Sequence, residues 1–295
     1  MKDLEGKVAF ITGGATGLGL AMAKSFASAG MKIVLADIEQ DTLDEAVASF
    51  GETNADVHGI IVDVTDREGM ARAADEAEEK FGPVHVLCNN AGVATGGSTE
   101  TVSYEDWDWV LGVNIGGVVN GIQTFVQRMI DHGEGGHIVN TASLAGFIAS
   151  AGIMYSASKF AVVGMSEHLR IDLEPHGIGV SVLCPGFVKT RIHESDRNRP
   201  DEFATDREID DEELAVSGAM VNSGIEPEVV GECVLEGIRN NELYLFTHPE
   251  MADVIKIRFD QVLGSMDQSK INESQLPLAE AFKAQLSSRS LRDED

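Results

Sequence analysis

Short apolar runs rich in β-branched residues alternate along the chain with longer segments of helical periodicity. A parallel sheet covered by helices on both faces produces this alternation, because each crossover between parallel strands needs a helix. We therefore predict an α/β fold with seven strands. The runs lie at residues 7–12, 31–37, 57–63, 84–92, 136–143, 179–186 and 242–248.

Two segments are longer than such a sheet requires. Residues 189–218 are polar and acidic and directly follow a CPG turn at the carboxyl end of a predicted strand, where ligands of α/β proteins bind. We predict a mobile substrate flap over residues 190–225, with a plain surface insertion as the alternative. Beyond the last strand, an apolar stripe at helical spacing predicts a helix that packs in the core or against another subunit. The stripe consists of Met251, Val254, Ile255, Phe259, Val262 and Leu263.

These segments divide the chain into a main domain at 1–248 and a C-terminal helical extension or tail at 249–295. The N-terminus enters a strand-like run at once, too early and too short for a signal peptide, and no long apolar span follows. We therefore expect a soluble cytoplasmic protein.

The charge balance limits the classes of partner. Acidic residues outnumber basic ones by 49 to 22, which gives a net charge of −27 at pH 7. Binding to phosphate needs clustered Lys and Arg, so we expect neither nucleic acid nor an anionic membrane surface as a partner. An ordinary solvated acidic surface and adaptation to high salt both account for the charge.

The distribution of cysteine and histidine predicts no metal site. Cys88, Cys184 and Cys233 are far apart and form no C-x-x-C pair, so neither a disulfide framework nor a zinc site is indicated. None of the eight histidines pairs with a carboxylate at metal-ligand spacing.

The stretch TGGATGLG, residues 12–19, follows the first predicted strand and opens a helical pattern. Gly13, Gly17 and Gly19 let the backbone turn tightly and approach a pyrophosphate, whose charge is stabilised by the amide groups at the start of the helix. The alternative is a structural glycine turn without a ligand.

Two carboxylates end the next two predicted strands. Asp37 can accept hydrogen bonds from adenosine ribose hydroxyls and would repel a 2′-phosphate, and Thr16 and Ile38 beside it supply no compensating cation. This favours NAD over NADP. Asp63, together with Val64, could meet the adenine ring, or it could simply cap the following helix.

Tyr155 and Lys159 lie four positions apart in YSASK, one turn apart if the segment is helical. A neighbouring cation lowers the pKa of a phenol, so Tyr155 is predicted to act as an acid or base near neutral pH. An ordinary helix pair on a surface is the alternative.

Taken together, these motifs resemble the short-chain dehydrogenase/reductase family. The resemblance covers roughly residues 5–248 and rests on the motifs' order and spacing. The motifs are TGGATGLG (12–19), NNAG (89–92), Asn114 in GVNIGG, Ser143, YSASK (155–159) and CPGFVKT (184–190). It implies a single Rossmann-like domain, a three-layer sandwich around a seven-stranded parallel sheet, with NAD-binding and catalytic residues in that domain.

The resemblance assigns a catalytic tetrad. Tyr155 would be the general base in alcohol oxidation and the acid in ketone reduction, and Lys159 would lower its pKa and hold the nicotinamide ribose. Ser143 would donate to the substrate oxygen, and the main-chain carbonyl of Asn114 would hold a water next to Lys159. Ser143 lies twelve residues before Tyr155 where the family more often shows thirteen, so Ser150 is the alternative. A polar Asn inside a helix often marks a kink.

The same resemblance implies the contacts with the cofactor. The NNAG turn would close over the adenosine ribose through Asn89, and the CPGFVKT turn would bring the Val188 backbone and the Thr190 side chain to the nicotinamide carboxamide. The predicted cofactor-binding residues are Gly13, Thr16, Gly17, Leu18, Gly19, Asp37, Ile38, Asp63, Val64, Asn89, Ala91, Gly92, Tyr155, Lys159, Pro185, Gly186, Val188 and Thr190.

The predicted function is NAD-dependent interconversion of a hydrophobic secondary alcohol and its ketone. The expected pocket lining is mostly apolar and includes Val93, Phe147, Ile148, Ile153, Met154, Phe187 and Ile192. Residues 104–114, residues 176–186 and the long C-terminal region also resemble Cα-dehydrogenases that oxidise benzylic alcohols in lignin-derived aryl ethers. Steroid, terpene, cyclic ketone and 3-oxoacyl substrates remain alternatives, as do enoyl reduction and a catalytically silent NAD(H)-binding regulator. The family likeness implies a homodimer or homotetramer formed through helices at 104–131 and 155–174.

Overall fold

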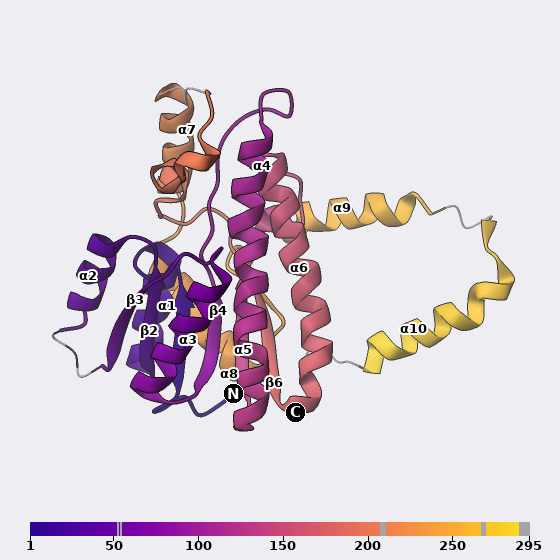
Figure 1. Ribbon diagram of the computed structural model, residues 1–295. Coiled ribbons are helices and arrows are strands. Elements are labelled where there is room, and N and C mark those ends of the chain that lie inside the picture. Colours follow the sequence, from indigo (N-terminus) through magenta and orange to yellow (C-terminus); the bar gives the residue numbers. More distant parts are fainter. Residues whose placement is uncertain (52, 54, 207–210, 267–269, 289–295) are drawn as a thin grey trace. The chain divides into compact units, whose positions relative to one another are not determined.

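The computed structural model describes residues 1–51, 53, 55–206, 211–266 and 270–288 (Figure 1). The chain forms two compact units, Met1–Thr247 and His248–Asp295, whose boundary lies one residue from the predicted division.

The first unit is built on one seven-stranded sheet in the order β3-β2-β1-β4-β5-β6-β7, and every neighbouring pair of strands is parallel. The strands are β1 (Val8–Thr12), β2 (Lys32–Asp37), β3 (Val57–Ile61), β4 (Val84–Asn89), β5 (Gly136–Thr141), β6 (Ile178–Cys184) and β7 (Tyr244–Phe246). Each predicted run contains or overlaps one strand, so the α/β prediction with a parallel seven-stranded sheet is confirmed.

Helices cover both faces of the sheet and give the predicted three layers (Figure 1). The helices of this unit are α1 (Gly17–Ser28), α2 (Gln40–Ala48), α3 (Arg67–Phe81), α4 (Tyr104–Leu111), α5 (Val118–His132), α6 (Ile153–Leu173), α7 (Asp211–Asn222) and α8 (Pro227–Asn240). Helices α1 and α8 pack against each other on one face, and α3 and α5 pack together on the other.

The central strands are apolar on both sides because each face contributes to a separate core. Ala9 and Ile11 belong to one cluster of buried residues, whereas Val8 and Phe10 belong to the other. Successive side chains of a strand point to opposite faces, so a strand covered on both faces becomes a continuous apolar run. The rings of Phe10 and Phe125 lie 4.7 Å apart in the second core.

The strand order places a crevice at the carboxyl ends of β1 and β4. From β1 the chain runs outward through β2 to β3 and then returns to the other side of β1 with β4. Loops that leave adjacent strands in opposite directions open a ligand crevice at this point. The predicted site segments follow this edge, since they lie after β1, at the end of β2, and after β4, β5 and β6.

A long helical run, Tyr104–His132, crosses one face of the sheet, and a π-helical turn at Gly112–Gly117 interrupts it between α4 and α5. Asn114 lies inside that turn, which confirms the expected irregularity. By length and composition this is the one helix among the described residues that could cross a membrane. It also packs a buried face into the fold, as core helices do: Trp109, Val118, Phe125 and Met129 are buried.

The predicted flap leaves β6 and forms two short 3-10 helices, η4 (Ile192–Asn198) and η5 (Asp201–Phe203), before α7. Its two ends meet in a parallel bridge between Val188 and Ile225. Residues 207–210 of the predicted flap lie outside the described residues.

The second unit contains helices α9 (Ala252–Gly264) and α10 (Leu276–Ser288). The predicted apolar stripe lies on and just before α9, where Val254, Phe259, Val262 and Leu263 are exposed. The packing of this helix in the core or against another subunit remains a prediction.

Candidate active site

The glycine-rich turn has a backbone that side chains would not permit. Gly13 and Gly17 adopt left-handed conformations, with φ of +59° and +51°. A Cβ on Gly19 would lie 2.0 Å from the Gly13 carbonyl oxygen. The first turn of α1 carries no acidic residue, and Thr16 makes no side-chain cap. This geometry leaves an approach to the helix N-terminus that suits a pyrophosphate.

The neighbouring strand β4 holds this turn in place. The Thr12 hydroxyl accepts hydrogen bonds from the backbone N–H groups of Asn90 and Ala91, at 2.9 and 3.1 Å. The Asn90 side chain donates to the carbonyls of Thr12 and Gly13, both at 3.1 Å. Asn90 thus holds the glycine-rich turn to the loop after β4.

Asp37 faces the same turn from the end of β2. One carboxylate oxygen accepts from the Ala15 N–H at 2.9 Å, and the other accepts from Ile38 and Glu39 at 2.8 and 3.2 Å. The carboxylate is therefore oriented by backbone donors beside the pyrophosphate approach, where a ribose would be expected. Ile38 is largely exposed.

Asp63 and Val64 are engaged within the protein. Asp63 accepts from both the N–H and the hydroxyl of Thr65 at 2.8 Å in a local turn, and the N-cap of α3 is Asp66 and not Asp63. Val64 packs against Gly117, and its carbonyl accepts from Asn120 at 2.8 Å. Their contact with an adenine ring remains a prediction.

The side chain of Asn89 does not face the crevice. It is 2% exposed, donates to the Asn140 carboxamide oxygen at 2.9 Å and fills the space beside Gly121. The last residue of this covered strand therefore points into the helix layer, and the predicted contact of Asn89 with a ribose remains a prediction.

The structure brings Tyr155 and Ser143 together. Tyr155 lies in the first turn of α6, and Ser143 caps a short 3-10 helix, η2 (Leu144–Gly146), after β5. Ser143 lies close enough to Tyr155 to lower the pKa of its phenol in part, and the Ser143 hydroxyl donates to the Pro185 carbonyl at 3.4 Å. Ser150 is exposed and binds Ser156 instead, so Ser143 is the serine at the tyrosine.

Lys159 lies behind Tyr155 and is 3% exposed. Its Nζ donates to the Thr141 carbonyl at 2.9 Å and lies 5.3 Å from the centre of the Tyr155 ring. A Cβ on Gly92 would come within 3.5 Å of this nitrogen. The predicted proximity of Tyr155 and Lys159 is therefore found, and the NNAG turn packs against the lysine.

The predicted acidity of Tyr155 is not found in the protein without a cofactor. Burial raises the pKa of Tyr155 above its ordinary value, and the hydrogen bond from Ser143 opposes this rise only in part. Burial also lowers the pKa of Lys159 to about 8. The spacing of two residues in a helix indicates how far apart they lie, but it does not indicate whether they are buried. Here burial removes water from both side chains and so disfavours the charged forms of Tyr155 and Lys159.

Asn114 connects the lysine helix to the loop after β4. Its carboxamide accepts from the Val93 N–H at 2.8 Å and donates to the Val93 carbonyl at 3.0 Å and the Ser158 hydroxyl at 3.1 Å. The side chain thus fixes Val93 beside the lysine. The predicted role of its main-chain carbonyl in holding a water remains a prediction.

The CPGFVKT turn closes the other side of the crevice. The Phe187 carbonyl and the Lys189 N–H both bond to Ile225, so the N–H and C=O of Val188 point to the opposite side of that bridge. Thr190 packs against Gly17 of the glycine-rich turn. The carbonyl of Pro185, which precedes Gly186, accepts from the Leu144 N–H at 2.9 Å.

The glycine-rich turn, Asp37 and the tyrosine site all lie at the carboxyl edge of the sheet. A family model described as short chain dehydrogenase matches residues 7–201. The chain belongs to the short-chain dehydrogenase family. A C alpha-dehydrogenase of Sphingobium sp. strain SYK-6 is 43% identical over 269 residues, 90% of this chain and 88% of that protein. An NADP-dependent (R)-specific alcohol dehydrogenase of Lentilactobacillus kefiri is 38% identical over 192 residues, 64% of this chain and 76% of that protein.

A solved short-chain dehydrogenase/reductase of Burkholderia phymatum, in complex with NAD, matches with a TM-score of 0.86 at 37% identity. The match covers 92% of this chain and 100% of that one. The protein is thus an oxidoreductase of alcohols or ketones that uses a nicotinamide cofactor. The glycine geometry and the oriented Asp37 fit such a cofactor.

Sequence reasoning missed how this short-chain dehydrogenase anchors its flap. Arg199, 10% exposed, pairs with the buried carboxylate of Asp106 at 2.9 Å and lies 4.2 Å from the centre of the Trp109 ring. The Ser195 hydroxyl accepts from the Ala94 N–H at 3.1 Å. The flap segment η4–η5 is therefore bound to α4 and to the loop after β4. In the sequence, the only indication of this anchoring is the presence of arginine within an acidic segment.

The flap is also bound at the far side of the crevice. Arg197 and Asn198 both donate to the Glu39 carboxylate, two residues beyond Asp37. Partial burial raises the pKa of Glu39, but the hydrogen bonds from Asn198 and Arg197 outweigh it and hold the pKa below its ordinary value.

The predicted apolar lining of the substrate site is only partly found. Phe147 is buried and packs against Phe246, with ring centres 5.2 Å apart, and Met154 and Val93 are buried near Trp109. These three residues are core residues, because they lie on the inner sides of their elements. Ile153 and Phe187 remain substantially exposed.

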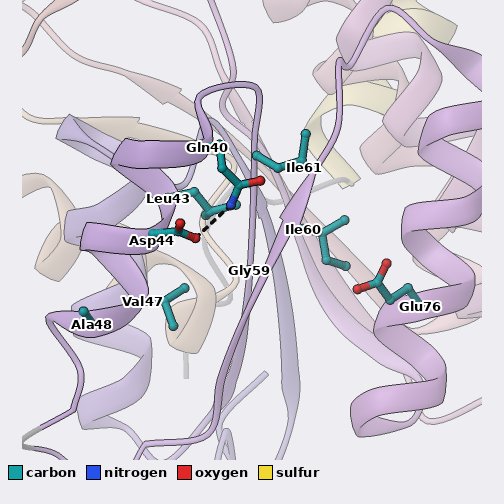
Figure 2. Close-up of a pocket in the computed structure, with 9 residues that line it drawn as sticks. All are labelled: Gln40, Leu43, Asp44, Val47, Ala48, Gly59, Ile60, Ile61 and Glu76. Atoms are coloured by element: carbon teal, nitrogen blue, oxygen red, sulfur yellow. Dashed lines mark hydrogen bonds between the residues drawn. The ribbon is translucent and has the colours of Figure 1, made fainter.

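A groove of about 660 Å³ lies elsewhere, between α2 and the edge strand β3 (Figure 2). Its lining includes Leu43, Ile60, Ile61 and Glu76, and Gln40 donates to Asp44 at 2.8 Å across the first turns of α2. No candidate catalytic residue lines it. It is therefore separate from the tyrosine site.

Proposed function

We propose that the protein is an NAD-dependent dehydrogenase that interconverts hydrophobic secondary alcohols, including aryl alcohols, and their ketones. The observation that carries this proposal is the convergence of Tyr155, Ser143 and Lys159 beside the glycine-rich turn.

In alcohol oxidation, Tyr155 takes the hydroxyl proton, and in ketone reduction it returns it. Ser143 is held by its contacts with Pro185 and Ala145, and its hydroxyl can turn from the Pro185 carbonyl to donate to the substrate oxygen. A nicotinamide dinucleotide held by the glycine-rich turn and Asp37 would supply the hydride acceptor. The Lys159 ammonium opposes the rise in the Tyr155 pKa that burial causes.

Asp37 supports the choice of NAD. Its carboxylate, oriented by three backbone donors, favours ribose hydroxyls and repels a 2′-phosphate. The Burkholderia phymatum relative is described as a complex with NAD, whereas the Lentilactobacillus kefiri relative is described as NADP-dependent. Family membership alone is therefore compatible with either dinucleotide.

We expect NADH to bind at least about tenfold more tightly than NADPH, because one unfavourable charge contact is worth about 1.4 kcal/mol or more. Titration of the nicotinamide fluorescence measures both dissociation constants at the same ionic strength. Equal affinities, or tighter binding of NADPH, would contradict the assignment of Asp37.

The substrate class rests on two observations. Ile153 and Phe187 are exposed apolar residues, and they lie in the segments that adjoin Tyr155 and the CPG turn. The relative with 43% identity is described as a C alpha-dehydrogenase. Both favour a hydrophobic alcohol over a sugar.

A panel of secondary alcohols, assayed for NADH formation at alkaline pH, tests this function. We expect aryl-substituted benzylic alcohols to give a higher kcat/KM than polyols of similar size, because apolar burial contributes about 25 cal/mol per Å². Binding of NADH without turnover of any alcohol or ketone would instead favour the regulator. A preference for polyols would contradict the proposal of a hydrophobic substrate.

A further inference from the structure

The flap reaches the loop that follows β2 through one carboxylate. Arg197 donates to Glu39 Oε1 from Nε at 3.1 Å and from Nη2 at 2.7 Å, and Asn198 donates to the same oxygen at 2.7 Å. These residues are 158 and 159 positions apart in the sequence from Glu39. Arg197 also donates from Nη1 to the carbonyls of Arg191 and Glu194, at 3.2 and 3.0 Å. Its guanidinium is therefore held in one orientation.

This guanidinium lies close to the residue that is expected to bind the adenosine ribose. The Glu39 N–H donates to Asp37 Oδ1 at 3.2 Å, so the two acidic residues are joined directly. The Arg197 and Glu39 side chains are 27% and 23% exposed, so their pair is open to a ligand from solvent. The sequence has no Arg or Lys adjacent to Asp37, but the fold supplies one from the flap.

We propose that Glu39 is a second determinant of cofactor specificity, which acts by neutralising Arg197 and so withholding it from a 2′-phosphate on the adenosine ribose. A guanidinium binds phosphate through paired N–H donors, and it is the group that would otherwise accommodate this phosphate. Here three donors from Arg197 and Asn198 are committed to Glu39, whose own charge adds to the repulsion from Asp37. The inference rests on the proposed dinucleotide site and deepens it.

The variant Glu39→Gln tests this mechanism. Glutamine keeps the length of the side chain and one oxygen acceptor for Arg197, but it removes the negative charge. We expect NADPH to bind about tenfold more tightly than in the unmodified protein, the effect of one charge contact, with NADH changed less than about threefold. Calorimetric titration with adenosine 2′,5′-bisphosphate and with 5′-AMP isolates the phosphate: only the bisphosphate is expected to gain affinity.

Two further variants test whether Arg197 causes the expected gain in affinity for NADPH. In Glu39→Gln/Arg197→Met the gain for NADPH and for the bisphosphate is expected to disappear, because the released cation is gone. Glu194→Gln removes a carboxylate of η4 that pairs with Arg191, the residue before this helix, and it is expected to leave both dinucleotide affinities unchanged. An intact affinity for 5′-AMP in each variant shows that the adenosine site is still folded.

An unchanged ratio of NADPH to NADH affinity in Glu39→Gln would overturn the inference, as would a gain that persists when Arg197 is replaced. Either outcome leaves the proposed function standing as long as the unmodified protein binds NADH and oxidises an alcohol. Failure of the unmodified protein to bind either dinucleotide would overturn both.

Discussion

Replacing Tyr155 with phenylalanine is expected to lower kcat/KM for alcohol oxidation by about 10³-fold, within the range of 10²–10⁴ for loss of a general acid or base. The variant keeps the ring that packs over Lys159 and removes only the hydroxyl, whose pKa Ser143 influences. The affinity for NADH is expected to change by less than about threefold, because the phenol acts on the substrate proton. Steady-state kinetics and fluorescence titration measure the two quantities separately.

The matched control is Tyr104→Phe, which removes a hydroxyl from a tyrosine that is 85% exposed at the start of α4. Its activity is expected to equal that of the unmodified protein within about twofold, as is usual for a surface substitution. If Tyr155→Phe keeps more than about a tenth of the activity, Tyr155 is not the acid or base. Ser143 or a bound water would then have to carry the proton.

The sheet could be predicted from the sequence because its determinants are local. A strand covered on both faces must be a continuous apolar run, and a crossover must contain a helix, so the seven strands and their parallel direction follow from pattern. The glycine-rich turn and the tyrosine–lysine pair were equally readable, since a left-handed turn and a helical spacing of four are each encoded within a few residues.

The burial of single side chains could not be predicted in the same way. Asn89 belongs to a recognisable NNAG motif, yet its side chain points into the helix layer toward Asn140 and Gly121. The pKa of Tyr155 was expected to fall because Lys159 lies near, but burial of both groups reverses the outcome. The direction of a side chain and its access to water depend on how neighbouring helices and strands pack. A short segment of sequence does not encode that packing.

The anchoring of the flap depends on contacts between distant segments. Arg199 contacts Asp106 and Trp109, and Arg197 contacts Glu39, although the residues of each pair are far apart in the sequence. The acidic composition of the flap indicated a solvated surface and concealed the few arginines that attach it. The net charge of a segment therefore indicates that it is solvated, whereas the contacts of each arginine can be found only from the folded structure.

Lys159 is expected to be needed for activity and yet to destabilise the folded protein at neutral pH. Its amine is 3% exposed, and burial lowers its pKa from 10.5 to about 8. At about 1.4 kcal/mol per pKa unit, the folded protein loses about 3 kcal/mol by carrying this amine in its charged form. The cost is fully present below pH 8. Between pH 8 and 10.5 the unfolded chain binds more protons, so stability of the unmodified protein rises with pH across that window.

The variant Lys159→Met, which has a similar length and no charge, is therefore expected to be about 2–3 kcal/mol more stable than the unmodified protein at pH 7. The difference should shrink above pH 8 and approach zero above about pH 10.5, where the amine is neutral in the unfolded chain as well. Urea unfolding of the cofactor-free proteins at both pH values measures it, and the other titrating groups cancel in the comparison. Activity should fall by at least about 100-fold.

Lys24→Met is the control, because it removes an exposed ammonium from α1 and should change stability by less than about 0.5 kcal/mol at either pH. A Lys159→Met protein that is less stable than the unmodified one at pH 7 would show that the bond to the Thr141 carbonyl outweighs the burial of charge. A difference that does not vary with pH would show that the amine is already neutral at pH 7. An inactive but stabilised variant, by contrast, would mean that the site holds its amine charged at the expense of fold stability, because a proton must be moved there.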